Sequence, residues 1–126
     1  MKKLVIVLTA VILGISCTTQ DTKTEAHEKV DVKTFLDGLK SNSKNILLID
    51  VRTPGEFNNG NIKNAINLNY YDSNFQQQIS KLDTSKIAYI YCKLGGRSNK
   101  AAKVLISSGF KKVVDLSGGF NAYSNQ

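Results

Sequence analysis

The residues with the clearest chemical potential lie in one short loop, residues 92–98, which reads Cys-Lys-Leu-Gly-Gly-Arg-Ser. A cysteine placed between a strand and a helix meets unpaired backbone N–H groups and the positive end of the helix dipole, and both favour thiolate over thiol. Gly95 and Gly96 allow the backbone to curl so that its amides face the Cys92 sulfur. Arg97 and Lys93 add positive charge. Such a loop suits a sulfur nucleophile that must hold an anionic leaving group.

Two simpler interpretations of Cys92 stand beside this one. Free cysteine is often a small, inert core residue, and Cys92 follows an apolar run. A disulfide with Cys17, the other of the two cysteines, is the second alternative. The Gly-Gly-Arg sequence after Cys92 favours the reactive interpretation. The chain holds one histidine, His27, so we expect neither a His-based metal site nor a Ser-His-Asp triad, and we expect no metal and no cofactor.

Two apolar segments position these residues. Residues 45–50 and 87–92 are continuous apolar runs, as strands covered on both faces require, and they end in Asp50 and Cys92. Helical spacing of apolar residues predicts amphipathic helices near 32–39, 75–82 and 98–108, the first with Asp31 as its N-cap. Thr53-Pro-Gly-Glu56 predicts a short helix with a capping box. Short strands are expected at 65–68 and 112–116, and a final helix at 118–123.

Strands that alternate with helices indicate an α/β fold, a parallel sheet with helices on both faces. In such sheets ligands bind beyond the carboxyl ends of the strands. The chemistry is therefore expected around Asp50 and Cys92.

The N-terminus resembles an export signal. Met1-Lys-Lys3 precedes a 12-residue apolar run, shorter than the ~20 residues that span a bilayer. Leu13-Gly-Ile-Ser-Cys17 resembles the lipobox of bacterial lipoproteins, although Gly14 stands where an aliphatic residue is usual. We expect residues 1–16 to be a lipoprotein-type signal peptide, Cys17 to be lipidated, and the protein to be exported and lipid-anchored in a bacterial cell envelope, on the periplasmic or outer face. An ordinary cleaved signal and an uncleaved anchor are the alternatives.

The rest of the chain divides into two segments. Residues 17–28 are polar and are predicted to be a flexible tether in which His27 is solvated. Residues 29–126 are expected to form one domain.

Three stretches of that domain are similar to single-domain rhodaneses, a family of sulfurtransferases. Asp50-Val-Arg-Thr-Pro-Gly-Glu-Phe57, continuing through Gly60 to Asn67, resembles the family's D-V-R-x-x-x-E-F motif, with Asn61 and Asn64 in place of the usual His and Gly. The 92–98 loop resembles C-x-x-G-x-R-S. Gly118-Gly-Phe-Asn-Ala-Tyr123 resembles the terminal G-G-[aromatic]-x-A-W.

The resemblance implies a central five-stranded parallel sheet and a two-step transfer of sulfane sulfur. The Cys92 thiolate would take sulfur from an anionic donor such as thiosulfate, and cyanide or a thiol would then remove it from the Cys92 persulfide. The substrate-binding residues would be Lys93, Leu94, Gly95, Gly96, Arg97 and Ser98, with Lys93 and Arg97 holding the donor's oxygens. Asp50 and Arg52 would support the site, for which a structural ion pair is the favoured role. Gly118 and Gly119 would serve close backbone packing.

Two other classes of function compete with this one. The alternative is a module that relays persulfide sulfur or senses thiols with little turnover of thiosulfate. A phosphatase or arsenate reductase, which resembles this fold, needs a longer loop than the four residues between Cys92 and Arg97.

The formal net charge of +7 suggests an anionic partner. Residues 84–114 hold seven basic residues and no acid, which places the positive excess around Cys92. With an export signal and no binding motif, nucleic acid is not expected as a partner.

Overall fold

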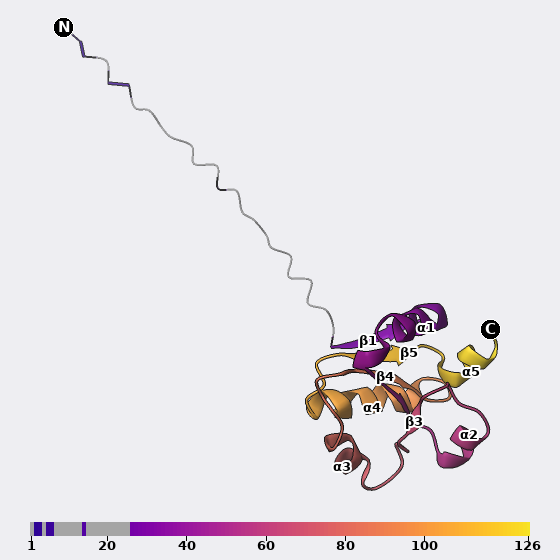
Figure 1. The fold of residues 1–126 in the computed structure, drawn as a ribbon. Helices are drawn as coiled ribbons and strands as arrows, with labels where there is room; N and C mark the ends of the chain where they lie inside the picture. Colours follow the sequence, from indigo (N-terminus) through magenta and orange to yellow (C-terminus); the bar gives the residue numbers. More distant parts are fainter. Residues whose placement is uncertain (1, 4, 7–13, 15–25) are drawn as a thin grey trace.

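The computed structural model describes residues 2–3, 5–6, 14 and 26–126, and the last range forms an α/β domain (Figure 1). Strands and helices follow one another along the chain. They are β1 (His27–Val30), α1 (Val32–Ser41), η1 (Ser43–Asn45), β2 (Ile46–Asp50), α2 (Pro54–Asn58), β3 (Ile66–Asn67), α3 (Phe75–Ser80), β4 (Ile87–Tyr91), α4 (Gly96–Ser107), β5 (Val113–Leu116) and α5 (Gly119–Ser124).

The five strands form one parallel sheet in the order β1-β5-β4-β2-β3. The predicted five-stranded parallel sheet is thereby confirmed. In the register of β2 and β4, Asp50 lies beside Tyr91, so the carboxyl ends of the two central strands meet at one edge. Asp50 and Cys92 thus lie at the same end of the sheet, where the strands reach their carboxyl ends, as the apolar runs predict.

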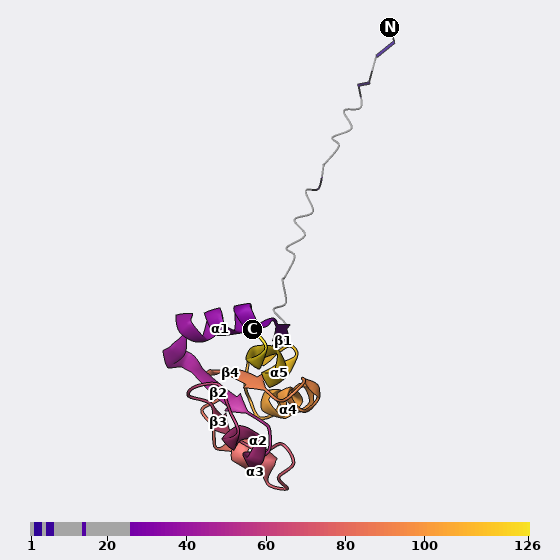
Figure 2. The ribbon, with the colours of Figure 1, turned by 90° about the vertical axis from the view of Figure 1, so that its right-hand side faces the viewer.

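Helices cover both faces of the sheet (Figure 1, Figure 2). On one face, Ile49 and Ile90 pack with Ala101 and Leu105 of α4 and with the apolar residues of α3. On the other face, a second core brings together Leu48, Tyr89 and Leu116 with Phe35 of α1, and Phe120 and Tyr123 of α5 pack against it. Adjacent residues of a strand point to opposite faces, so an unbroken apolar run supplies both cores.

The predicted helix caps are confirmed. The Asp31 side chain accepts a hydrogen bond from Thr34 N at the start of α1. Thr53 and Glu56 form a capping box, with Pro54 as the first residue of α2. The helix after Cys92 begins at Gly96, two residues earlier than the apolar spacing suggests.

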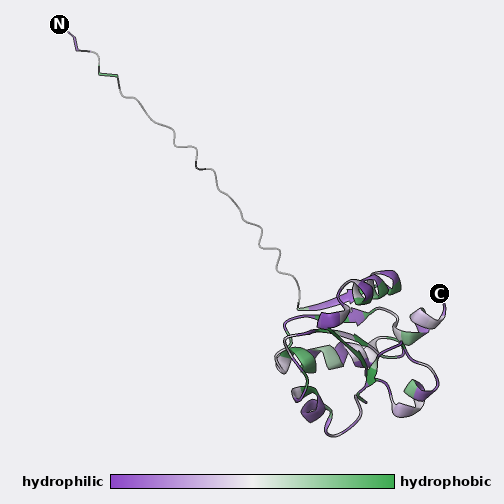
Figure 3. Ribbon diagram, viewed as in Figure 1, coloured by the Kyte–Doolittle hydropathy of each residue, from purple (hydrophilic) through white to green (hydrophobic). Residues whose placement is uncertain are grey.

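The prediction for His27 is wrong. His27 lies in β1, which pairs with β5 at the edge of the sheet, and its Nε2 is 3.0 Å from Oδ2 of the buried Asp115. The strand reads His-Glu-Lys-Val and is mostly hydrophilic (Figure 3). Its backbone hydrogen bonds and the His27–Asp115 contact hold it in place, so apolar patterning does not reveal it. Residues 27 and 28, which the sequence assigns to the tether, therefore belong to the first strand of the sheet.

The expected signal peptide and Cys17 lie almost entirely outside the described residues. Within the described part of the chain, no helix has the length and apolar character needed to cross a membrane.

Candidate active site

Cys92 directly follows β4, and its side chain is buried with an exposed fraction of 1%. The Sγ atom accepts a hydrogen bond from the backbone N–H of Gly95 at 3.0 Å and lies 3.5 Å from Oγ of Ser98. Ser98 is itself buried, and the single proton of its hydroxyl can be donated either to the Gly95 carbonyl at 3.2 Å or to the Cys92 thiolate. The first turn of α4 and the preceding loop therefore wrap around the sulfur.

This environment favours the Cys92 thiolate. Burial raises the pKa of the thiol, but the Ser98 hydroxyl and the backbone N–H groups of Ser98, Gly95 and Leu94 outweigh burial, and the net effect lowers the pKa. Hydrogen bonds to the charged form are the usual means of stabilising a nucleophilic sulfur. Cys92 thus has the properties of an activated nucleophile.

The turn around the sulfur depends on one glycine more than on the other. Gly95 adopts a φ of +118°, a conformation that side chains disfavour, whereas Gly96 is an ordinary first residue of α4. The left-handed turn at Gly95 aims its N–H at Sγ. The sequence assigns the tight curl to both glycines, but the structure assigns it to Gly95.

The start of α5 holds the base of the loop. Phe120 N donates to the Cys92 carbonyl at 2.8 Å, and Asn121 N donates to the Lys93 carbonyl at 3.1 Å. A Cβ on Gly119 would lie 2.5 Å from both of those carbonyl oxygens, so the close approach requires glycine. The packing role predicted for Gly119 is therefore confirmed, and it connects the terminal motif to the backbone of Cys92.

Arg97 is paired with an acidic residue that the sequence reading did not place in the site. Its Nη1 and Nη2 atoms donate to Glu56 Oε1 and Oε2 at 2.7 and 3.0 Å, and its guanidinium lies 5.5 Å from the Tyr71 ring centre. The hydrogen bonds from Arg97 lower the pKa of Glu56 to about 2. The family resemblance implies that Arg97 holds a donor's oxygens, whereas in this structure its guanidinium is paired with the carboxylate of Glu56.

Lys93 and Leu94 form the exposed tip of the loop. The Leu94 side chain has an exposed fraction of 66%, and Tyr71 has the same value. Lys93 is also exposed. These side chains are available to contact a substrate or a partner.

Asp50 and Arg52 form a buried ion pair. Nη2 of Arg52 lies 2.6 Å from Oδ2 of Asp50, and the same nitrogen donates to the Gly60 carbonyl at 2.7 Å. The Arg52 guanidinium also stacks on the Phe120 ring, 4.1 Å from its centre. This network joins the end of β2 to α5. The geometry therefore supports a structural role for the Asp50–Arg52 ion pair. The pair is connected to Cys92 through Phe120 of α5, whose backbone N–H donates to the Cys92 carbonyl.

Sequence reasoning missed Glu56, Tyr71 and Asp115 as neighbours of the loop. Glu56 is recognisable in the sequence as the N3 residue of a capping box and as the Glu of the D-V-R-x-x-x-E-F motif, but neither signal points to its ionic partner, which is 41 positions away. Asp115 interrupts an apolar strand, which is the one local signal it offers. Among the described residues, no three His, Cys, Asp or Glu side chains gather in a group that could hold a metal ion.

The parallel α/β fold and the loop around a buried cysteine are features of the rhodanese class, and comparison with known proteins gives the same result. The rhodanese-like domain family matches residues 32–126. The chain belongs to the rhodanese-like family.

Individual relatives support this membership. The chain is 36% identical over 81 residues to the thiosulfate sulfurtransferase GlpE of Shewanella oneidensis, covering 64% of this chain and 78% of that protein. It is 34% identical over 102 residues to the Arabidopsis thaliana rhodanese-like/PpiC domain-containing protein 12, covering 79% of this chain but only 32% of that much longer relative. A crystal structure of a rhodanese-related protein from Thermoplasma volcanium superimposes with a TM-score of 0.64 at 28% identity, covering 78% of this chain and 91% of that one.

Proposed function

We propose that this protein is a sulfurtransferase that carries sulfane sulfur as a persulfide on Cys92. The observation that carries the proposal is the hydrogen bonding of Sγ by Gly95 N and its contact with Ser98, which together favour the thiolate. Backbone N–H groups fixed around a buried sulfur also stabilise the negative charge that a persulfide retains. Membership of the rhodanese-like family agrees with this chemistry.

The reaction has two displacement steps. In the first, the Cys92 thiolate attacks the outer sulfur of a thiosulfate-like donor. A bond forms between the two sulfurs, the donor's S–S bond breaks, and sulfite leaves with the electron pair. In the second, cyanide or a thiolate attacks the terminal sulfur of the persulfide, and Cys92 leaves as a thiolate. The enzyme is thereby regenerated, and no external oxidant or reductant is required.

The class of sulfur donor is proposed from the charges around the Cys92 loop. Lys93 is exposed at the loop tip, so it is placed to attract an anionic sulfur compound. Arg97 would contribute its charge only in competition with Glu56. Thiosulfate is the test donor because a relative of this chain is named for that activity.

A second candidate function has its own observation. The Arg97 fork is occupied by Glu56, and the exposed side chains of Leu94 and Tyr71 offer apolar contacts at the loop and beside Arg97. These features favour a persulfide relay or thiol-sensing module that exchanges sulfur with a protein thiol and turns thiosulfate over slowly.

Sulfur transfer to cyanide from thiosulfate distinguishes the two functions. Rapid production of thiocyanate that Cys92→Ser abolishes supports the enzyme, and Cys17→Ala is the matched control that should retain activity. A persulfide that forms on Cys92 but moves only to a protein thiol supports the relay. If mass spectrometry after thiosulfate treatment finds no added sulfur on Cys92, both functions are wrong.

We also propose that the protein is exported and anchored to a membrane through a lipid on Cys17. The support is the sequence alone: the positive start, the short apolar run and the Leu-Gly-Ile-Ser-Cys segment. Radiolabelled fatty acid should be incorporated by the wild-type chain and lost in Cys17→Ala. Label that persists in this variant would contradict the proposal.

A further inference from the structure

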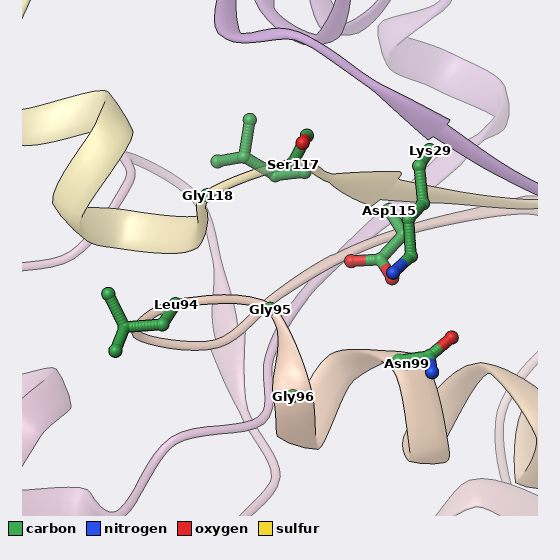
Figure 4. Close-up of a pocket in the computed structure, with 9 residues that line it drawn as sticks. Lys29, Leu94, Gly95, Gly96, Asn99, Asp115, Ser117 and Gly118 are labelled. Carbon is green, nitrogen blue, oxygen red and sulfur yellow. The ribbon is translucent and has the colours of Figure 1, made fainter.

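A polar cavity of about 280 Å³ lies between the start of α4, the end of β5 and the edge strand β1 (Figure 4). Its polar side chains are Lys29, Asn99, Asp115 and Ser117, and its wall includes Leu94, Gly95 and Gly96 of the Cys92 loop. Arg97, Glu56 and Tyr71 do not line it. The cavity therefore shares Leu94, Gly95 and Gly96 with the Cys92 loop but does not include the Arg97–Glu56 pair.

Asp115 places a buried carboxylate in the wall of this cavity. Its exposed fraction is 1%, and its Oδ2 is fixed by His27 Nε2 at 3.0 Å. Its Oδ1 is buried and accepts no hydrogen bond of ordinary length among residues 26–126, although the Ser98 hydroxyl is close enough to lower the pKa of this carboxyl against the burial that raises it. Figure 4 shows the carboxylate pointing into the space between β5 and α4. An unsatisfied buried acceptor costs about 1–3 kcal/mol, so a donor from outside the chain would be bound favourably here.

The other lining groups narrow the class of that donor. Lys29, from β1, directs its side chain toward the same space and brings a positive charge (Figure 4). A simple anion would be repelled by Asp115, and a simple cation would be repelled by Lys29. A molecule that carries both an ammonium and a carboxylate satisfies both residues. Asn99 and Ser117 can each donate and accept, so they fit either end of such a molecule.

The size of the cavity sets a further limit. A water molecule occupies roughly 30 Å³, so the space far exceeds what a single water on Oδ1 would need. Small-molecule sites begin at about 300 Å³, so the ligand must be small. We propose that this cavity is a second ligand site, which binds a small zwitterion of the amino-acid class with its ammonium on Asp115 and its carboxylate toward Lys29. This site does not depend on the proposed sulfur transfer.

The test uses S-methyl-L-cysteine, an amino acid without a free thiol, which cannot accept sulfur. Added to the ¹⁵N-labelled full chain, it should shift the amide signals of Gly95, Gly96 and Asn99 saturably, with a Kd of about 1 mM or below. The shifts should vanish with the N-acetylated probe, which lacks the ammonium, and weaken at least about tenfold in Asp115→Asn. Cys92→Ser should bind as the wild type does, which separates this site from the sulfur chemistry.

Three results would overturn the proposal. Shifts that do not saturate by about 10 mM mean that the cavity holds water only. Unchanged binding in Asp115→Asn, or equal binding of the N-acetylated probe, would show that Asp115 does not bind the ammonium of the ligand. If Asp115→Asn does not fold, substitution of the exposed Lys29 tests the site instead. Lys29→Met should weaken binding at least about fivefold while Lys44→Met, an exposed lysine away from the cavity, does not, and equal binding by the two variants contradicts the site.

Discussion

Ser98 is the side chain that most directly controls the sulfur. Its hydroxyl lies 3.5 Å from Cys92 Sγ and lowers the thiol pKa, against the burial that raises it. Ser98→Ala should therefore raise the pKa and slow alkylation by iodoacetamide at pH 7 by about fivefold, the value of a hydrogen bond of about 1 kcal/mol. The thiolate fraction falls as pH drops below the pKa, so the alkylation profile of the variant should move to higher pH. A profile that does not move would show that the backbone amides alone set the pKa.

The Glu56–Arg97 pair sets how much charge the site offers an anion. Glu56→Gln keeps a residue that can complete the capping box of α2 while removing the carboxylate that occupies Arg97. We expect kcat/KM for thiosulfate to rise up to about fivefold, because an ion pair worth about 1 kcal/mol no longer competes with the donor. An unchanged or reduced kcat/KM would show instead that Glu56 positions Arg97 for the reaction.

The same pair predicts a pH dependence of stability. Arg97 lowers the pKa of Glu56 from 4.5 to about 2, so the stabilisation is complete above the unfolded value and is lost as pH falls toward the folded value. The wild type should be more stable than Glu56→Gln by about 1 kcal/mol at pH 7. That difference in the free energy of unfolding should disappear between pH 4.5 and about 2, as measured by urea denaturation. A difference that persists at the acid end would assign it to packing rather than to charge.

At the scale of elements, the site is a loop clamped by α5. A Cβ on Gly119 would meet the carbonyl oxygens of Cys92 and Lys93 at 2.5 Å, and the residue also has a φ of +60°. Gly119→Ala should therefore lower the free energy of unfolding by about 2–3 kcal/mol and reduce sulfur transfer. Gly55→Ala in α2 is the matched control, because the space around Gly55 is open and alanine favours helix. Equal effects of the two substitutions on stability would refute the clamp.

The elements also show what the sequence can and cannot predict. The apolar runs of β2 and β4 and the caps at Asp31 and Thr53 are local signals, and the structure confirms them. β1 has no such signal, because an edge strand needs little apolar surface and is held by backbone pairing. The His27–Asp115 contact spans 88 positions and the Glu56–Arg97 pair spans 41, so only the folded sheet brings those partners together.

At the scale of the whole molecule, folding reduces the positive excess that the sequence places around Cys92. Arg97 is paired with Glu56, and Lys112 Nζ lies 3.6 Å from Glu28. Two of the seven basic residues in 84–114 are therefore compensated. Lys93, at the loop tip, is the positive charge placed nearest in sequence to the nucleophile. Attraction of an anionic donor should then depend on a few specific lysines rather than on the net charge.

Salt provides the measurement of that attraction. The Debye length falls from ~30 Å at 0.01 M to ~10 Å at 0.1 M, so kcat/KM for thiosulfate should fall at least about twofold over that range. Lys93→Gln should lower kcat/KM and flatten its dependence on salt, whereas Lys44→Gln should leave both unchanged, because Lys44 lies in η1 and shares no element with the Cys92 loop. A flat salt response in the wild type would show that charge does not steer the donor. Equal effects of the two substitutions would assign the attraction to net charge, since each removes one positive charge from the same molecule.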